Sequence, residues 1–416
     1  MSVVRPFKAV RPTPALADKV AALPYDVMNS DEAREMVVGN PYSFLHVDKA
    51  EIDLDPGINL YDVKVYEKAR DNLNEMIQKG VFIQDEKPCL YIYKQVMDAR
   101  AQIGIVGCTS IDDYRNNIIK KHELTRADKE LDRINHVDYC DANTGPIFLT
   151  YRAQSRIDQL VKSVMDSKAP VYDFVSEDGI GHTVWVMDED AVISEICEIF
   201  AGVENLYIAD GHHRSASAVR VGMKRREQNP AWDGSEEFNY FLSVIFPDDQ
   251  LYIMDYNRIV KDLNGYTQAR FLAAVGEKFD IEEYAGEGTL KPAQKHTYGM
   301  YLEGKWYLLT AREGSFDAGD PVARLDVSIL QNNLLSPILG IGDPRTDKRI
   351  DFVGGIRGLQ CLADRVDSGE MQVAFSMYPT TMEDLMDIAD AGAIMPPKST
   401  WFEPKLRSGV FIHKLK

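Results

Sequence analysis

The sequence predicts a mixed α+β protein built from two regions, and three observations support this. The chain has 416 residues, enough for two or three domains. Its first half alternates apolar, β-favouring runs with segments at helical spacing. After Trp232 the sequence becomes rich in β-favouring runs separated by turn residues. We therefore expect an N-terminal α/β region over residues 1–230 and a C-terminal α+β region over residues 231–416, ending in a loop-rich strap.

The first elements follow from capping residues and hydrophobic periodicity. Ser30 is expected to cap a helix, because acids and helix formers follow it in SDEAREMVV. The clearest helix is VYEKARDNLNEMIQKG, whose apolar residues recur at helical spacing before Gly80 as a stop signal. CLYIYKQV and AQIGIVGCTSI are predicted strands, and the glycines of the second indicate close backbone approach.

The remaining elements lead up to and beyond one unusual motif. The polar stretch from Asp112 to Asn135 is expected to mix a loop with a helix. IDQLVKSVMDS and EDAVISEICEIFAG are amphipathic helices, and ENLYIA is a strand. Beyond the motif, FNYFLSVIFPDDQLYIMDYNRIV predicts two strands joined as a hairpin around Pro-Asp-Asp, and a further helix is expected over Leu325–Leu339.

Composition and charge exclude several classes of protein. With 47 basic and 65 acidic residues, the net charge is −18, which disfavours nucleic acid as a partner. Five scattered cysteines without a CxxC pair argue against a disulfide framework or a structural zinc site. No stretch is long and apolar enough for a membrane span or a signal peptide. We expect a cytoplasmic protein without a membrane partner, and the sequence leaves homo-oligomerisation open.

The motif is NLYIADGHHRSASAVRV, Asn205–Val221, where a strand passes into a helix. Asp210 is expected to cap that helix through its side chain, and Gly211 lets the backbone turn sharply or approach a ligand closely. The first N–H groups of the helix then lack intrahelical partners and carry the positive end of its dipole. Such a helix start binds anions, and phosphate is the usual occupant.

Three interpretations of the motif compete. In the first, Asp210 is only a cap and the histidines satisfy buried polar groups, but this explains a five-residue cluster poorly. In the second, His212 and His213 bind a metal, but adjacent histidines project in different directions, unlike an i, i+4 pair, and Arg214 disfavours a cation. The third is phosphate binding, in which Arg214 grips the phosphate as a bidentate fork and the histidines donate hydrogen bonds or move a proton. We favour the third.

DGHHR after a strand and before a helix resembles the signature of the ParB/sulfiredoxin superfamily, which includes free serine kinases. This resemblance implies a ParB/sulfiredoxin-like core around the motif, a loop that holds nucleotide phosphates, and ATP or ADP as the cofactor. The whole chain also resembles a narrower bacterial and archaeal group, domain of unknown function 1015. The matching stretches are RPFKAVRP (Arg5–Pro12), LPYDVMNSDEAREM (Leu23–Met36), NPYSFLHV (Asn40–Val47), KKHELT (Lys120–Thr125), DGHHR and MPPKSTWFEPKLRSG (Met395–Gly409).

Two further stretches supply candidate site residues. Asp26, in the turn-like PYDV, is either a turn cap or a Mg²⁺ ligand near the phosphates. In KKHELTRADKELDR, Lys121 and His122 offer positive charge and a proton carrier, and Glu123 offers a general base or a metal ligand; a solvated helix is the alternative. The expected catalytic residues are Glu123, Asp210 and His212. The expected nucleotide-binding residues are Gly211, His212, His213, Arg214, Ser215, Lys121 and His122.

Two loops complete the candidates. MPPKSTWFEPKLRSG carries Lys398, Ser399, Thr400, Lys405 and Arg407, either as a strap over an anionic ligand or as a packed C-terminal arm. GDPRTDKRIDFVGG, at Gly342–Gly355, is a weaker candidate.

The function predicted from these residues is nucleotide-dependent phosphoryl transfer to the hydroxyl of a small metabolite, with Mg²⁺ and with serine as the first acceptor to test. The alternatives are a non-catalytic nucleotide-binding regulator of ParB type and, third, a metal-dependent hydrolase.

Overall fold

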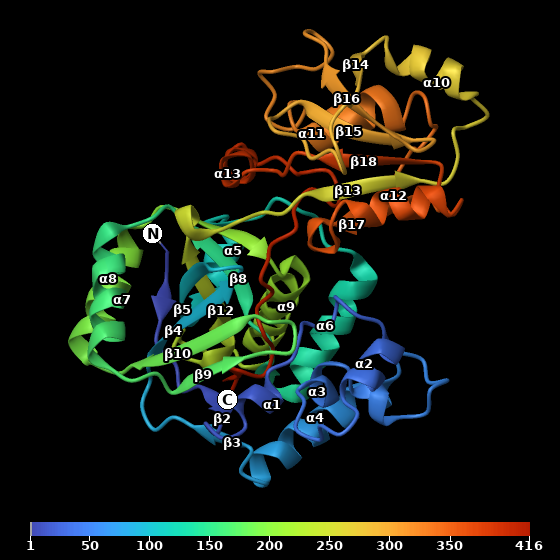
Figure 1. Cartoon of the computed structure of the whole chain (residues 1–416). Coiled ribbons are helices and arrows are strands. Elements are labelled where there is room, and N and C mark those ends of the chain that lie inside the picture. The colour runs from blue at the N-terminus through green and yellow to red at the C-terminus, as the bar shows by residue number, and fades with distance from the viewer. Residues whose placement is uncertain (1) are drawn as a thin grey trace. The chain divides into compact units, whose positions relative to one another are not determined.

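A computed structural model describes residues 2–416, and the chain forms two compact units (Figure 1). The first unit comprises the chain up to Leu251 together with Pro404–Lys416, and the second comprises Tyr252–Glu403. Both contain helices and strands, so the predicted mixed α+β class is confirmed. The sequence predicts a division after residue 230, whereas the two units divide at Leu251 and again at Glu403, since the end of the chain returns to the first unit.

The first unit is built on one large mixed sheet. Within the described residues it has nine strands, in the order β6-β11-β8-β12-β5-β4-β10-β9, with β1 beside β5. The strands are β1 (Val4–Arg5), β4 (Leu90–Met97), β5 (Arg100–Ser110), β6 (Ile119–Lys120), β8 (Ile147–Tyr151), β9 (Tyr172–Val175), β10 (Gly181–Met187), β11 (Leu206–Asp210) and β12 (Tyr240–Pro247).

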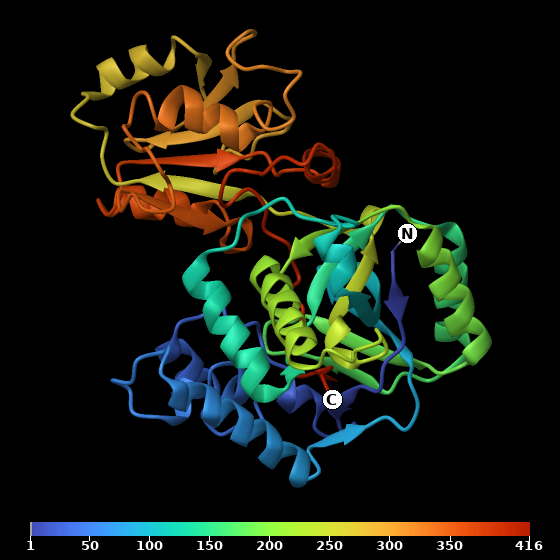
Figure 2. The same ribbon diagram turned by 180° about the vertical axis from the view of Figure 1, so that it is seen from behind.

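Helices cover both faces of this sheet. Helices α7 and α8 lie together on one side, and α6 and α9 lie side by side on the other (Figures 1 and 2). The bounds are α1 (Ala17–Val20), α2 (Ser30–Met36), α3 (Leu45–Asp48), α4 (Val63–Gln78), α5 (Ile111–Arg115), α6 (Ala127–Cys140), α7 (Ser155–Ser167), α8 (Asp190–Gly202) and α9 (His212–Gln228). A core of apolar side chains from the sheet, α7, α8 and α9 holds the layers together, and it fixes where the strand ends present their polar residues.

Two short strand pairs of the first unit lie outside its large sheet. β2 (Val10–Pro12) pairs with β3 (Phe82–Gln84), and β19 (His413–Lys414) near the C-terminus pairs with β7 (Ala142–Asn143). The predicted strands CLYIYKQV and AQIGIVGCTSI correspond to β4 and β5. A Cβ on Gly104 of β5 would lie 2.7 Å from Val244 of β12, which confirms the close approach expected at these glycines.

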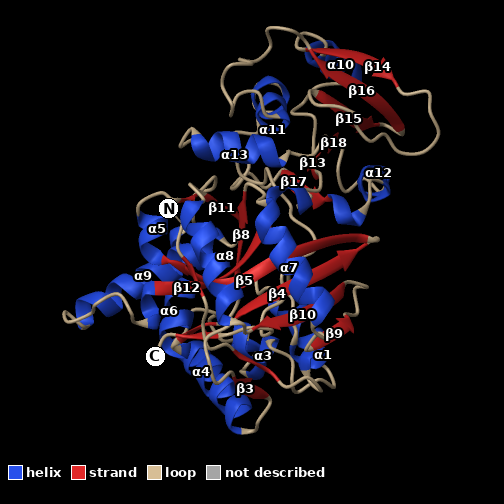
Figure 3. Cartoon of the chain, turned by 90° about the vertical axis from the view of Figure 1, so that its left-hand side faces the viewer, coloured by secondary structure: helices blue, strands red, loops and turns tan. Residues whose placement is uncertain are grey.

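The second unit is an antiparallel sheet with helices, which Figure 3 shows by secondary structure. Its described strands follow the order β14-β16-β15-β18-β13-β17. They are β13 (Tyr256–Val260), β14 (Phe279–Glu283), β15 (Thr297–Leu302), β16 (Lys305–Ala311), β17 (Ile350–Gly354) and β18 (Val373–Met377), with helices α10 (Gln268–Val275), α11 (Asp326–Leu330), α12 (Gln360–Asp367) and α13 (Met382–Asp390). Among the described residues, no helix is both long enough and apolar enough to cross a membrane.

Two expectations about local structure are wrong. The strands flanking Pro-Asp-Asp do not form a hairpin, because β12 pairs with β5 and β8 whereas β13 pairs with β17 and β18 in the other unit. The N-cap residue of α2 is Asn29 rather than Ser30. The Asn29 side chain accepts hydrogen bonds from the N–H groups of Asp31 and Glu32, and the Glu32 carboxylate accepts one from the N–H of Asn29. A one-residue shift of this kind preserves the capping chemistry.

Candidate functional site

Two neighbouring strands bring the DGHHR motif and the polar run KKHELT together. Strand β6 pairs in parallel with β11, with Lys120 opposite Tyr207. Because parallel strands end at the same edge of a sheet, His122 and Glu123 after β6 lie beside the DGHHR turn after β11. After Lys120, which ends β6, the rest of KKHELT forms a loop that leads into α6, as the predicted mixture of loop and helix requires. We call the residues at this shared edge, from Lys121 to Glu123 and from Asp210 to Arg214, the strand-end site.

Gly211 makes the sharp turn between β11 and α9. Its φ of 92° lies in the left-handed region, and a Cβ there would lie 3.1 Å from Nε of Arg214. Gly211 itself is the N-cap residue, and the prediction that Asp210 caps the helix is wrong. Oδ1 of Asp210 instead accepts the N–H of Gly211 at 2.8 Å, and Oδ2 accepts from Nζ of Lys405 at 3.2 Å.

The start of α9 presents three backbone N–H groups. Those of His212, His213 and Arg214 have no carbonyl four residues earlier within the helix. Ser215 is already engaged: its N–H donates to the carbonyl of Gly211 at 2.9 Å, and its hydroxyl donates to the carbonyls of Gly211 and His212. The positive end of this 17-residue helix is therefore concentrated on three donors, and Ser215 supports the turn.

Arg214 turns back toward the Gly211 bend. Its Nε is buried and has no hydrogen-bond partner in the described part of the chain. Burial acts to lower the pKa of Arg214, but Asp26 and Asp210 outweigh burial and raise that pKa. The guanidinium therefore stays charged beside the helix start.

His122 and His212 face each other at the shared edge. Their rings meet edge to face, with centroids 4.5 Å apart and an angle of 86° between the planes. Burial lowers the pKa of His122 to about 4. The pKa of His212 lies well below its usual value, chiefly because the ring is buried and secondly because His122 lies beside it. Both imidazoles are therefore neutral at pH 7, and the role of His122 as a proton carrier stays a prediction.

Glu123 and Lys121 flank this histidine pair. Oε2 of Glu123 lies 3.9 Å from Nδ1 of His212, and the Glu123 side chain is 45% exposed. The ammonium of Lys121 lies 4.3 Å from the ring centroid of Tyr114. Lys121 still acts electrostatically on His212 and contributes to the low pKa of that histidine.

His213 points away from the histidine pair. Its Nε2 accepts the backbone N–H of Arg126 at 3.0 Å, which anchors the loop before α6. Burial lowers the pKa of His213, and the exposed Asp26 opposes that shift. Asp26 thus acts on both His213 and Arg214, so the structure brings this distant acid toward the motif, while its role as a Mg²⁺ ligand stays a prediction.

A buried polar cluster beside Arg214 was not predicted from the sequence. Oδ1 of Asp48 accepts the hydroxyl of Thr144 at 2.9 Å and lies 3.5 Å from Nε2 of His136. These groups line a cavity of about 20 Å³, room for about one water molecule. Its other lining residues include Tyr25, Arg133, Asn143, Arg214 and Ser217. The one sequence feature that points to Asp48 is its position directly after NPYSFLHV, one of the stretches that resemble the family.

The C-terminal strap contributes one residue to the strand-end site. Lys405 reaches Asp210, whereas Arg407 donates to Ser176 at 3.0 Å and pairs with Asp178. In the second unit, Nη2 of Arg258 donates to the carbonyl of Lys398 at 2.8 Å. Ser399 and Thr400 also belong to that unit. Of the strap residues named from sequence, Lys405 contacts the motif through Asp210.

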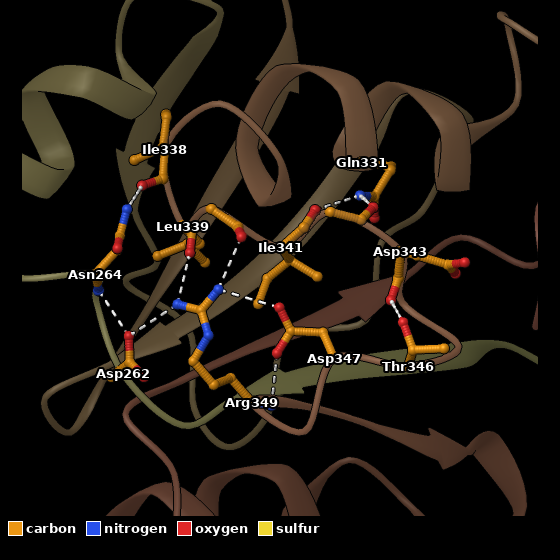
Figure 4. A network of polar contacts seen from close by, with 12 residues as sticks. Asp262, Asn264, Gln331, Ile338, Leu339, Ile341, Asp343, Thr346, Asp347 and Arg349 are labelled. Atoms are coloured by element: carbon orange, nitrogen blue, oxygen red, sulfur yellow. Dashed lines mark hydrogen bonds and ion pairs between the residues drawn. The ribbon is translucent and has the colours of Figure 1, made fainter.

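The stretch Gly342–Gly355, expected to be a loop, is a loop only before β17 (Ile350–Gly354), and this part belongs to a polar network within the second unit (Figure 4). The Arg349 guanidinium donates to the carbonyls of Leu339 and Gly340 and pairs with Asp347 at 3.1 Å. Gln331 donates to the carbonyl of Ile341 at 2.8 Å. These contacts give Arg349 and Asp347 a structural role, and a ligand at this stretch stays a prediction.

Comparison with known proteins gives the family. Residues 4–328 match the family described as protein of unknown function, DUF1015. The chain belongs to this family. No curated protein matches the chain.

Three solved structures are similar to the chain at low identity. SbnI with a C-terminal truncation, from Staphylococcus aureus, is 11% identical with a TM-score of 0.38, covering 73% of this chain and 85% of its own. A free serine kinase in complex with AMP is 14% identical with a TM-score of 0.36, covering 73% and 91%. A conserved hypothetical protein from Pyrococcus furiosus is 14% identical with a TM-score of 0.34, covering 73% and 93%.

Proposed function

We propose that this member of the DUF1015 family binds the phosphates of a nucleotide at the start of α9 and transfers a phosphoryl group to the hydroxyl of a small metabolite. The observation that carries the proposal is Arg214. Its Nε is buried without a hydrogen-bond partner among the described residues, beside three helix N–H groups. A buried donor left unsatisfied costs about 1–3 kcal/mol, and an anion at the helix start removes that cost.

Phosphate suits this arrangement better than a carboxylate does. A phosphate has enough oxygens to accept from the N–H groups of His212 and His213 and from the Arg214 fork at the same time. The left-handed Gly211 lets the backbone approach the ligand closely. Asp26, exposed and close enough to influence Arg214, is the proposed ligand for the Mg²⁺ that accompanies the phosphates.

Of the two carboxylates considered for the acceptor hydroxyl, Glu123 is the better base. Burial acts to raise the pKa of Asp210, but Lys405 and Arg214 outweigh it and hold that pKa well below the usual range. A carboxylate with so low a pKa accepts a proton poorly. Glu123 is partly exposed and lies beside His212, where an acceptor can reach it.

Nucleotide binding is tested by thermal unfolding of the full chain with ATP, ADP and AMP, with and without Mg²⁺. At a concentration about 100 times Kd, binding adds about 2.7 kcal/mol of stability, and we expect the Tm to rise by several degrees. Arg214→Ala should abolish the rise. Arg220→Ala, on the same helix and with a side chain 72% exposed, should keep it. Absence of any nucleotide-dependent rise in the wild type would refute the proposal.

Turnover is tested separately, because a ParB-type regulator binds a nucleotide without phosphorylating a small acceptor. The wild type is incubated with ATP or ADP, Mg²⁺ and serine, and products are followed by phosphorus NMR. Formation of a phosphomonoester that is lost in Glu123→Gln supports phosphoryl transfer. Nucleotide binding without any phosphorylated product, across a panel of hydroxyl acceptors, would favour the regulator instead.

A further inference from the structure

We propose that His122, His212 and Glu123 form a binding site for a divalent transition-metal ion, a site distinct from the Mg²⁺ position assigned to Asp26. One ligand atom from each of the three residues lies within 4.8 Å of the others. The inference does not rest on the proposed function, since the three side chains meet whether or not a nucleotide binds.

The spacing is close to that of a metal centre. An ion held at about 2.1 Å by nitrogen and oxygen requires its ligand atoms to lie within roughly 4.2 Å of one another. The observed separations reach up to 4.8 Å, so small side-chain movements are needed to close the site around an ion. Oε2 of Glu123 already lies 3.9 Å from Nδ1 of His212, and its side chain is 45% exposed and so has room to move. The two imidazoles are already packed against each other, with centroids 4.5 Å apart.

The histidine nitrogens supply the second, independent observation. Both ring nitrogens of His122 and Nε2 of His212 are buried and make no hydrogen bond of normal geometry in the described part of the chain, although the backbone of Ile208 interacts with the His122 ring. His122 is 2% exposed and His212 is 6% exposed. Buried polar atoms are almost always satisfied, and one unsatisfied nitrogen on each of two facing imidazoles indicates a missing partner. The second nitrogen of His122 carries the ring proton and is left to the backbone of Ile208. The missing partner accepts lone pairs from two imidazoles, which a metal ion does.

The donor set selects the class of metal. Imidazole suits zinc, iron, cobalt and nickel, whereas Mg²⁺ prefers oxygen ligands and keeps several waters. Two histidines and one carboxylate leave at least one coordination position open, as in catalytic rather than structural centres. Asp210 acts electrostatically on both imidazoles and favours a cation there, while Lys121 opposes it at His212.

The proposed site differs from the metal hypothesis drawn from sequence. That hypothesis paired His212 with the adjacent His213, but His213 is bonded to the backbone of Arg126. The partner of His212 is His122, 90 residues earlier by number, delivered by the parallel pairing of β6 with β11. His213 therefore provides a matched control, a neighbouring histidine outside the proposed centre.

The experiment is metal titration of the chelator-stripped full chain without nucleotide. Co²⁺ is followed by its visible absorption and Zn²⁺ by calorimetry, for the wild type, His122→Gln, Glu123→Gln and His213→Gln. We expect one equivalent of either metal to bind the wild type and His213→Gln alike. Glu123→Gln should weaken binding at least about tenfold, and His122→Gln should weaken it further. Far-UV circular dichroism checks that each variant is folded; because Glu123 is partly exposed, its variant keeps the test valid if His122→Gln misfolds.

Two results would overturn the proposal. One is a wild type that binds neither metal stoichiometrically. The other is a Glu123→Gln variant that binds the metal as tightly as the wild type. If that variant retains the metal and loses only phosphoryl transfer, Glu123 acts as the base of the proposed function. Conversely, metal binding by a protein that binds no nucleotide would support the centre and refute the proposed function.

Discussion

Nζ of Lys405 lies 3.2 Å from Oδ2 of Asp210, and this contact joins two residues 195 positions apart in the sequence. Asp210 ends β11, and Lys405 lies in the segment that returns to the first unit after the second unit is complete. The Lys405 side chain is 13% exposed and that of Asp210 is 30% exposed, so water screens the pair only in part. The C-terminal segment is thereby fastened to the turn that begins α9.

Removing Lys405 should destabilise the first unit. In Lys405→Met the Asp210 carboxylate loses the cation that contributes most to lowering its pKa, keeps only Arg214 as a charged partner of that kind, and remains charged at pH 7. A hydrogen bond to a charged group contributes about 1.5–3 kcal/mol, and we expect a loss of this size in the free energy of urea unfolding. Lys405→Arg should lose less free energy of unfolding, because it keeps a positive charge at this position. The double variant Lys405→Met with Asp210→Asn should recover stability, because the uncompensated charge is gone. Equal stability of Lys405→Met and the wild type would contradict this account.

Gly211 permits a second prediction, with an internal control. Its φ is 92°, and a Cβ would lie 3.1 Å from Nε of Arg214. Gly234 has a φ of 95°, and a Cβ there would have no neighbour within 4 Å. Alanine at either position should cost about 1 kcal/mol from backbone strain alone. Gly211→Ala should cost more, because the alanine also displaces the Arg214 guanidinium. Chemical unfolding of both variants measures the difference. Equal losses in the free energy of unfolding would show that the Arg214 side chain moves aside without a cost in stability.

Local elements near the motif were predictable because their signals are local. The apolar run ending at Asp210, the turn glycine and the small residues of α9 all lie within Asn205–Val221. The meeting of His122 with His212 was not predictable, since it depends on parallel pairing of a two-residue strand, β6, with β11. No periodicity marks so short a strand. Both halves of the strand-end site were therefore visible in the sequence, but the way they join was not.

The hairpin expected around Pro-Asp-Asp failed for a related reason. The runs of β12 and β13 are β-favouring and separated by turn residues, which is the pattern of a hairpin. That pattern reports that two strands flank a turn, but the partner of each strand is set by long-range packing. Ser243 of β12 faces Gly107 of β5, whereas Asn257 of β13 faces Val353 of β17. The sequence change noticed after Trp232 thus marks a boundary that lies within this segment, at Leu251.

Asp326 gives the second unit a distinctive pH dependence. Burial raises the pKa of this carboxyl to about 7, against 3.8 for an ordinary Asp. Its Oδ1 accepts the backbone N–H of His296 at 2.6 Å, which opposes the shift without cancelling it. Between pH 4 and pH 7 the native carboxyl keeps a proton that the unfolded chain releases. The unfolded state then binds fewer protons, so stability falls as pH rises through this window and levels off above it.

The variant Asp326→Asn isolates that contribution. Asparagine keeps an oxygen that accepts the His296 N–H but does not titrate, so the variant should lose the decline between pH 4 and pH 7. At pH 8 it should be more stable than the wild type by about 4 kcal/mol at most, the equivalent of a pKa difference of about 3. Asp387→Asn, whose side chain is 41% exposed in an ion pair with Arg324, is the control and should follow the wild-type curve. Urea midpoints measured from pH 4 to pH 8 make the comparison. If Asp326→Asn declines as steeply as the wild type, the carboxyl is already ionised in the folded protein near pH 5, and burial has not raised its pKa.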